Sequence, residues 1–257
     1  LPGAACYTAN TVLKAGGGAS VLAFPRSIKN LAQQKLTGST VLSYEDNSDE
    51  YLKDGNLDEL DHKIRWADVI ALGPGLGREK NTQKAVLELL KNYKSKSFVI
   101  DADGLYPLSN KKYKSIDLKN KVLTPHHKEF ADLLGITISE LEKDLLELGR
   151  KFSINTESYL VLKGAPTMIF NPAGEVFVNS SGNEGMAKFG TGDVLTGLIA
   201  AMISQSANIE QAVIASVYIH GLAADLLLDN LTEFGITADD ISNNLPKAIK
   251  FLRKSIV

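Results

Sequence analysis

The sequence contains only one cysteine, Cys6, among its 257 residues. A single cysteine cannot form a disulfide within the chain, which suits a reducing compartment and favours a cytoplasmic location. Long hydrophobic runs are missing as well, because the longest, such as 198–203, fall far short of the ~20 residues of a membrane-spanning helix. No excess of basic charge is present, since the formal net charge is −2. We therefore expect neither a membrane nor a nucleic acid as a partner.

Motifs of several familiar enzyme classes are also missing. The four histidines show no His-Glu-x-x-His spacing and Cys6 stands alone, so we expect no structural zinc site and assign no metal ligand. No Gly-x-Ser-x-Gly segment indicates a hydrolase. Residues 185–190 have the glycine spacing of a phosphate-binding P-loop, but the lysine that should follow Gly190 is absent. We therefore do not expect a P-loop nucleotide hydrolase.

Short apolar runs that predict strands alternate with helical patterns along most of the chain. This alternation predicts an α/β fold with a mainly parallel central sheet flanked by helices. The segment Asn171-Pro172-Ala173-Gly174 predicts the turn of a late β-hairpin, and only helices are expected after residue 193. Since no repeat or linker interrupts the pattern, we expect one domain over residues 1–257. Individual helices are predicted at 2–14, 139–151, 209–229, 238–243 and 245–254.

Polar or glycine-rich loops directly follow four of the predicted strands, at 73–77, 101–104, 125–129 and 163–167. In parallel sheets ligands bind beyond the carboxyl ends of the strands, so these loops should gather at one edge. The residues of each loop can be explained in two ways. The glycines of 73–77 fit a close approach of ligand to backbone, or a tight turn, and do not match G-x-G-x-x-G.

The acidic and basic residues of these loops also leave alternatives open. Asp101 and Asp103 could hold Mg²⁺ through water or cap the following turn. His126 fits a hydrogen bond to a ligand or a place on the surface. Lys163 could meet a phosphate or simply face solvent.

A glycine-rich loop runs into an apolar helix at Gly190-Thr191-Gly192-Asp193. Free backbone N–H groups and the positive end of the helix dipole meet there, which suits an anion. Asp193 places a carboxylate in the same mouth and predicts a base beside a phosphoryl group. An ordinary helix start with a stabilising carboxylate is the alternative interpretation.

Six segments occur together in an order and spacing typical of one enzyme family: VIALGPGLG, VIDADGL, VLTPHHKEFADLLG, LVLKGAPTMI, GNEGMAKFGTGDVLTGLIAAMI and SVYIHGLAADL. Over nearly its whole length the sequence resembles the ADP/ATP-dependent NAD(P)H-hydrate dehydratases, a branch of the ribokinase-like superfamily. The opening LPGAACYTANTVLKAGGGASVLAFP is similar to the family's first helix and second strand. The family's preceding strand is missing, so we expect it upstream of Leu1.

The resemblance implies an enzyme that returns hydrated NADH or NADPH to the intact cofactor. The terminal phosphate of a nucleotide would move to the ring hydroxyl, and phosphate would then leave. Asp193 would take the hydroxyl proton, while the N–H groups of Gly190, Thr191 and Gly192 stabilise the transferring group. Mg²⁺ would shield the phosphates. The bacterial appearance of TPHHKEF implies ADP as the donor, with ATP the donor of the eukaryotic form.

The resemblance also implies binding residues and partners. The nucleotide would contact Gly192 and Lys163, Gly164, Ala165, Pro166 and Thr167. The hydrated cofactor would contact Ala4, Gly75, His126 and Asp193. Relatives form homotetramers, and in many bacteria an NAD(P)H-hydrate epimerase is fused to the domain. Phe189 departs from the family pattern, in which glycine is frequent.

Two other functions compete with this prediction. A ribokinase-superfamily kinase for a vitamin precursor or sugar alcohol would share the segment 190–193. A nucleotide-binding protein without catalysis would fit the unusual Phe189.

Overall fold

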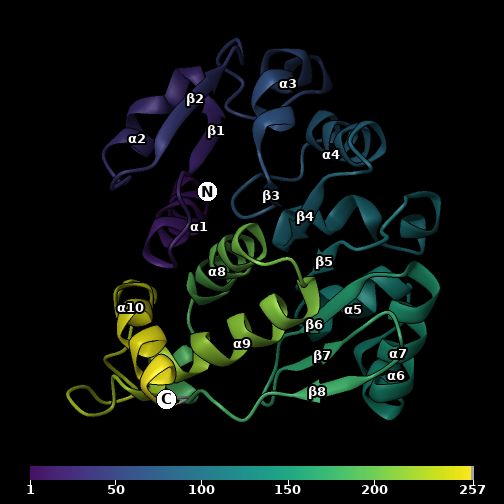
Figure 1. Cartoon of the computed structure of the whole chain (residues 1–257). Coiled ribbons are helices and arrows are strands. Elements are labelled where there is room, and N and C mark those ends of the chain that lie inside the picture. The colour runs from purple at the N-terminus through teal and green to yellow at the C-terminus, as the bar shows by residue number, and fades with distance from the viewer. Residues whose placement is uncertain (256–257) are drawn as a thin grey trace.

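The computed structural model of the chain describes residues 1–255, and within them the strands form a two-stranded and a six-stranded sheet (Figure 1). The strands are β1 (Val21–Pro25), β2 (Thr40–Tyr44), β3 (Val69–Leu72), β4 (Ser97–Ile100), β5 (Val122–Leu123), β6 (Tyr159–Leu162), β7 (Met168–Phe170) and β8 (Val176–Val178).

The helices lie between the strands as far as β6, and the last helices follow the hairpin of β7 and β8. They are α1 (Pro2–Lys14), α2 (Lys29–Gln33), α3 (Leu57–Trp66), α4 (Lys80–Asn92), α5 (His127–Leu134), α6 (Ile138–Lys143), α7 (Leu145–Thr156), α8 (Thr191–Gln205), α9 (Ile209–Asp225) and α10 (Ala238–Ser255). No helix within residues 1–255 is both long and apolar enough to cross a membrane.

The larger sheet has the order β3-β4-β5-β6-β7-β8. Strands β3 to β6 are parallel, and β7 and β8 complete the sheet as an antiparallel hairpin. The central strands are buried on both faces, which explains why their sequences are continuous apolar runs rather than alternating ones. The predicted parallel sheet with a late hairpin is confirmed.

Helices cover both faces of this sheet (Figure 1). In one core, alternate strand residues such as Phe98 and Leu160 pack against the helices α3 to α7. A second core joins the intervening residues, such as Val99 and Val161, to α8 and α9. Because successive side chains point to opposite faces, each strand serves both cores. Helices α1 and α10 pack outside this layer against α8 and α9.

Two helix predictions are wrong. The single helix expected at 139–151 is two helices, α6 and α7, because Asp144 between them takes a non-helical conformation. The two helices expected at 238–243 and 245–254 are one, although Pro246 lies inside it. Proline removes one helical hydrogen bond, at a cost of about 3 kcal/mol. Burial of the surrounding residues Ile241, Leu245 and Ala248 in the core offsets that cost.

Candidate active site

The carboxyl ends of β3 to β6 lie side by side. Leu72 pairs with Ile100, and Ile100 pairs with Leu123. Beyond the ends of β5 and β6, His126 and Lys163 face each other as an isolated parallel bridge. The predicted meeting of the strand-end loops at one edge is confirmed.

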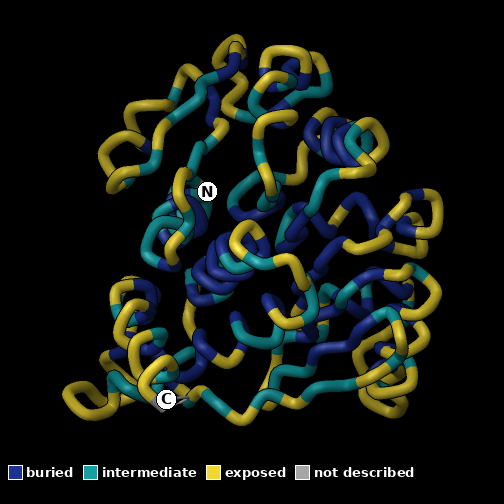
Figure 2. The backbone as a smooth tube through the Cα atoms, in the orientation of Figure 1, coloured by how far each residue is buried: buried dark blue, intermediate teal, exposed yellow. Residues whose placement is uncertain are grey.

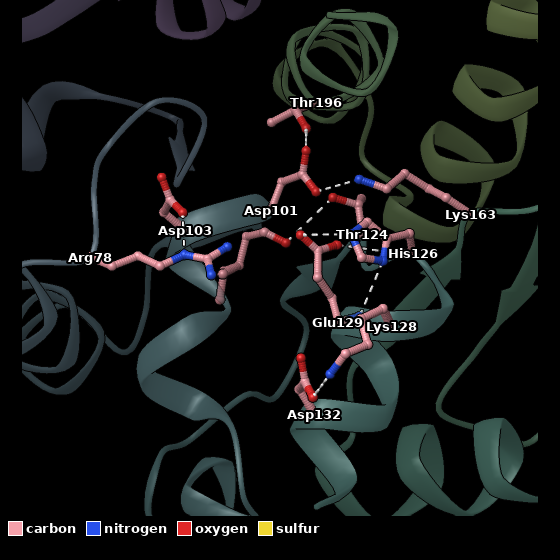
Figure 3. Close-up of polar contacts among 11 residues, drawn as sticks. Arg78, Asp101, Asp103, Thr124, His126, Lys128, Glu129, Asp132, Lys163 and Thr196 are labelled. Carbon is pink, nitrogen blue, oxygen red and sulfur yellow. Dashed lines mark hydrogen bonds and ion pairs between the residues drawn. The ribbon is translucent and has the colours of Figure 1, made fainter. Parts of the chain in front are cut away.

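A buried ion pair forms the centre of this edge (Figure 3). Asp101 follows β4 and is 1% exposed, and its Oδ1 accepts a hydrogen bond from Lys163 Nζ at 2.6 Å. Its Oδ2 accepts the hydroxyl of Thr196, in α8, at 2.9 Å. Burial alone would lower the pKa of Lys163, but the carboxylates of Asp101, Glu129 and Asp193 raise it. Lys163 is therefore held charged next to the start of α8.

The alternative in which Asp101 and Asp103 cap the following turn is not confirmed. Asp101 makes no side-chain capping bond, and both of its oxygens are engaged as described above. Asp103 Oδ1 lies 2.7 Å from Arg78 Nε (Figure 3). Its Oδ2 accepts the Gly77 N–H at 3.0 Å. Among the described residues, no three His, Cys, Asp or Glu side chains lie together as metal ligands would.

Helix α8 begins at the predicted anion mouth, with Gly190 as its N-cap residue. Gly190 has φ +95°, and a Cβ there would lie 2.9 Å from the Cβ of Ala238 and 3.1 Å from the ring of Tyr7. Both the backbone conformation and the space require glycine. Three distant segments of the chain thus fix the position of this helix start.

Two N–H groups of this first turn are available for a ligand. The N–H groups of Gly192 and Asp193 find no carbonyl or side-chain acceptor among residues 1–255. The Thr191 N–H instead points to the carbonyl of Lys188 at 3.5 Å. A Cβ on Gly192 would lie 3.3 Å from Lys163 Nζ, so the lysine and the helix start face one space. Backbone donors, helix dipole and ammonium together suit a phosphoryl group.

Asp193 lies in the first turn of α8 and is half-buried. Its pKa is raised from 3.8 to about 6, mainly by burial and then by the charge of Asp101. Lys163 opposes that rise. A carboxylate with a pKa near 6 is ionised at neutral pH and still accepts a proton readily, as a general base requires.

The start of α1 connects Asp193 to the turn after β3. Thr8 Oγ1 donates to the carbonyl of Asp193 at 3.0 Å and lies 3.3 Å from the carbonyl of Ala4. The amino group of Leu1 donates to the carbonyl of Gly75 at 2.9 Å. A Cβ on Gly75, whose φ is +70°, would lie 3.3 Å from the Cβ of Ala4 and 2.2 Å from the Leu1 carbonyl. Ala4, Gly75 and Asp193 therefore lie close together.

The segment 164–167 forms an exposed turn at the end of β6. Thr167 Oγ1 donates to the carbonyl of Gly164 at 3.1 Å and closes the turn. Ala165 and Pro166 at its tip are exposed, and a cis peptide bond joins them. A Cβ on Gly164 would lie 3.0 Å from Nε2 of His127, so α5 flanks the turn.

His126 is the N-cap residue of α5. Its Nδ1 accepts the Glu129 N–H at 3.2 Å, while Glu129 Oε2 accepts the His126 N–H at 2.9 Å. This reciprocal capping box fixes the ring at the same edge as Lys163 (Figure 3). More than half of the His126 side chain is exposed, and its Nε2 lies 3.6 Å from Glu129 Oε1.

Sequence reasoning did not identify His220 as part of this region. His220 lies in α9, is 6% exposed and hydrogen-bonds to the backbone of Thr191. Burial lowers its pKa to about 4, so the ring is neutral. Its Nε2 is buried with no hydrogen-bond partner in the described part of the chain. The sequence signals are a lone histidine among apolar neighbours and its place in the segment SVYIHGLAADL.

The loop before α8 is held from the opposite side by Lys188. Its Nζ donates to the carbonyls of Glu233, Phe234 and Ile236. The neighbouring Phe189 projects fully into solvent. Its side chain therefore does not narrow the anion mouth by packing into it.

Comparison of the chain with known proteins identifies its family. The family model described as NAD(P)H-hydrate dehydratase matches residues 1–247. The bifunctional NAD(P)H-hydrate repair enzyme Nnr of Thermofilum pendens is 35% identical over 253 residues, which are 98% of this chain and 48% of that protein. The chain thus spans about half the length of the first curated relatives it matches.

Solved structures agree with the sequence match. The ADP/ATP-dependent NAD(P)H-hydrate dehydratase of Bacillus subtilis, co-crystallised with ATP/Mg²⁺ and soaked with CoA, has a TM-score of 0.79 at 28% identity, covering 98% of this chain and 87% of that one. A ribokinase-like superfamily protein of Enterococcus faecalis has a TM-score of 0.83 at 28% identity, with coverages of 97% and 82%. The fold is ribokinase-like, and the chain belongs to the NAD(P)H-hydrate dehydratase family.

Proposed function

We propose that this chain catalyses the nucleotide-dependent dehydration of hydrated NADH or NADPH to the intact cofactor. The observation that carries the proposal is the position of Asp193. Its carboxylate lies in the first turn of α8, with free backbone donors beside it and Lys163 charged against the same turn. A base and an anion site in one mouth support phosphoryl transfer to a hydroxyl group.

The first chemical step joins the hydroxyl oxygen of the hydrated ring to the donor's terminal phosphorus. Asp193 accepts the hydroxyl proton while the bond from that phosphorus to the leaving nucleotide breaks. The N–H groups of Gly190, Gly192 and Asp193 have no acceptor among residues 1–255. Together with the ammonium of Lys163 they stabilise the charge on the transferring group. In the second step the carbon–oxygen bond breaks, phosphate leaves with the bonding electrons, and a proton passes from the neighbouring ring carbon to water as the double bond forms.

The residues present fit a magnesium ion carried by the nucleotide. No cluster of three carboxylate, histidine or cysteine ligands occurs within residues 1–255. Mg²⁺ is usually held by one or two carboxylates together with substrate phosphates, so a dedicated protein cage is not needed. Asp103 and Glu129 lie at the same edge and are candidates for a contact through water (Figure 3). The ion supplies shielding of phosphate charge.

The remaining predicted contacts divide between the two substrates. We propose that Ala4, Gly75 and His126 bind the hydrated cofactor. We propose that the turn from Lys163 through Gly164, Ala165 and Pro166 to Thr167 binds the nucleotide, together with Gly192. Thr191 contributes through its side chain, which bonds to the carbonyls of Met186 and Lys188 and shapes the turn. Phe189, fully exposed beside the mouth, is available to stack on a ring.

The test uses the purified chain, hydrated NADH and Mg²⁺, with ADP and ATP in separate reactions. Return of the near-ultraviolet absorbance of the dihydronicotinamide ring is the expected result, and ADP is expected to be the better donor. Failure with both donors would contradict the proposal. If mass spectrometry finds a stable phosphorylated product from a sugar alcohol or vitamin precursor instead, the chain is a kinase.

We further propose that residues 1–257 act as one catalytic domain of a homotetramer. The bifunctional repair enzymes among the relatives are about twice as long as this chain, which supports a partnership with an epimerase activity. Sedimentation of the purified chain measures its oligomeric state and so tests the homotetramer. Faster turnover of mixed hydrate epimers when an epimerase is added measures the second.

A further inference from the structure

Arg78 carries a charge at the strand-end edge that the proposed chemistry leaves unused. It directly follows the glycine turn 73–77 at the end of β3, and this turn contains Gly75. About half of its side chain is exposed, whereas the buried parts of the molecule lie beneath this edge (Figure 2). Figure 3 shows its guanidinium beside Asp103, which follows β4. Arg78 is therefore placed at the edge where the two substrates are proposed to bind.

Two contacts fix the plane of the Arg78 guanidinium. Its Nε lies 2.7 Å from Oδ1 of Asp103, and Oδ2 of the same carboxylate accepts the N–H of Gly77. Asp103 thus holds both the side chain of Arg78 and the turn that precedes it. The guanidinium carbon lies 4.9 Å from the centre of the Tyr106 ring. A guanidinium that is bonded at one edge and lies over an aromatic ring loses little further freedom when it binds a ligand.

The terminal nitrogens of Arg78 point to no group of the protein. Within residues 1–255 the guanidinium has one hydrogen-bond acceptor, Asp103, which bonds to Nε. Nη1 and Nη2 are therefore available to a ligand. Their N–H groups form a rigid fork that matches two oxygens of a phosphate group.

An exposed ion pair is the ordinary explanation for Arg78 and Asp103, and a second arginine offers a comparison. Arg65 bonds through Nε to both oxygens of Asp61, at 2.9 and 2.8 Å, and lies over the Tyr93 ring at 5.7 Å. That pair spans one turn of a single helix. Asp103, by contrast, is 25 residues from Arg78, so this pair joins two strand-end loops. It lies where the ligands of parallel sheets bind.

The charges around Arg78 decide what kind of recognition is available. The hydrogen bond to Asp103 raises the pKa of Arg78, and the charge of Glu129 adds to the rise, so the guanidinium stays charged. Glu129 itself accepts the N–H of His126. Since these carboxylates balance the arginine, the region has no excess of positive charge. A ligand must therefore be recognised by the geometry of the fork.

We propose that Arg78 is a specificity-determining residue that binds a phosphate group of the hydrated cofactor. This inference rests on the proposed function, in which Gly75 contacts that cofactor. Arg78 follows Gly75 by three positions, which is at most roughly 10 Å of extended chain. In NADH one ribose separates the nicotinamide ring from the diphosphate bridge, so a phosphate lies within reach. NADPH offers a second source, the additional phosphate on its other ribose.

The experiment measures binding rather than turnover. NADH, NADPH and dihydronicotinamide riboside, which has no phosphate, are titrated against the unchanged chain and against Arg78→Gln and Arg78→Lys. We expect Arg78→Gln to weaken the binding of NADPH by about 10- to 100-fold, because a charge-assisted bidentate contact is lost. Arg78→Lys keeps the charge without the fork and should recover only part of the affinity. The riboside should bind equally to all three proteins.

The two cofactors distinguish the two phosphate groups. An equal loss for NADH and NADPH assigns the diphosphate bridge to Arg78, and a loss for NADPH alone assigns the additional ribose phosphate. Unchanged affinity for both cofactors would overturn the proposal. So would a loss confined to ADP, because Arg78 would then belong to the phosphate donor. Arg65→Gln is the matched control and should change none of these affinities.

The outcome separates this inference from the proposed function. Exposed ion pairs contribute little to stability, so the Arg78 variants should fold, and urea unfolding checks that they do. If the unchanged chain binds neither cofactor, the proposed function and the role of Arg78 fail together. If the unchanged chain and Arg78→Gln bind both cofactors equally well, only the role of Arg78 fails.

Discussion

The two halves of the proposed active site differ in how firmly the fold holds them. At the ends of β4 and β6, Asp101 is almost fully buried and satisfied by Lys163 and Thr196. At the end of β3, Gly75 approaches Ala4 and the Leu1 carbonyl, beside a groove of about 590 Å³ between β1 and β3. The phosphoryl side is therefore pre-organised by long-range contacts. The proposed substrate side is held by exposed contacts, such as the hydrogen bond from the Leu1 amino group to the Gly75 carbonyl.

This difference separates two kinds of effect. Changes on the phosphoryl side should alter the chemical step or the stability of the whole fold. Changes on the substrate side should alter KM and leave kcat nearly unchanged. The predictions below test that separation from the largest expected effect to the smallest.

Asp193→Asn should lower kcat by about 10²–10⁴-fold, because a positioned general base contributes about that much. The affinity for the nucleotide should change little, since the backbone donors of α8 remain. Steady-state kinetics and isothermal titration measure the two quantities. Asp132→Asn, in an exposed pair with Lys128, is the control. Equal rates for Asp193→Asn and the unchanged chain would mean that Asp193 is not the base.

Lys163→Met should reduce the free energy of unfolding by about 3–5 kcal/mol, because Asp101 would be left buried without its partner. Lys128→Met removes an exposed lysine from its pair with Asp132 and should cost less than about 1 kcal/mol. Urea unfolding measures both variants. Similar costs for the two lysines would show that the Asp101 pair does not organise the phosphoryl side.

The pH dependence of stability should carry the signature of Asp193. Its pKa rises from 3.8 to about 6 on folding, so the folded state holds the proton more tightly than the unfolded state. The contribution to stability is fully present below pH 3.8 and is lost as the pH rises through about 6. At neutral pH the ionised group costs up to about 3 kcal/mol, less screening by water at this half-buried site.

The comparison with Asp193→Asn isolates this contribution. The variant should be more stable than the unchanged chain at neutral pH, and the difference should disappear towards pH 4. Thermal unfolding over that range measures it. A difference independent of pH would contradict the raised pKa.

Gly75→Ala should have the smallest effect, a rise in KM for the hydrated cofactor with kcat nearly unchanged. Gly75 has φ +70°, a conformation that costs a residue with a Cβ about 1–2 kcal/mol. A Cβ there also meets the Leu1 carbonyl at 2.2 Å, so the substrate side must shift. Gly18→Ala, which meets nothing within 4 Å, is the matched control. A fall in kcat as large as that of Asp193→Asn would remove the separation between the two sides.

Most of the strand pattern could be predicted because buried parallel strands are short apolar runs between polar loops. The hairpin turn at Asn171–Gly174 was also visible in local residues. Pro246 shows the limit of such reasoning, since tertiary burial of Ile241 and Leu245 keeps the helix continuous. Propensity is a local quantity, whereas packing depends on the whole fold.

The candidate site shows the same limit. Asp193 could be found from the sequence because it directly follows the segment Gly190-Thr191-Gly192 at the start of a helix. The partners of Asp101, by contrast, lie 62 and 95 residues further along the chain, and nothing local indicates which lysine or threonine they are. His220 was missed because its contact to Thr191 arises only when α9 packs against α8.

Lys188 ties the glycine loop to the segment 233–236 through three carbonyl oxygens. Because one ammonium group donates to three carbonyls of the other loop, we expect the two loops to move together as one unit. Phe189 and Phe234, each exposed on one of these loops, therefore travel together. Any ligand that draws one aromatic ring towards the mouth of α8 also brings the other.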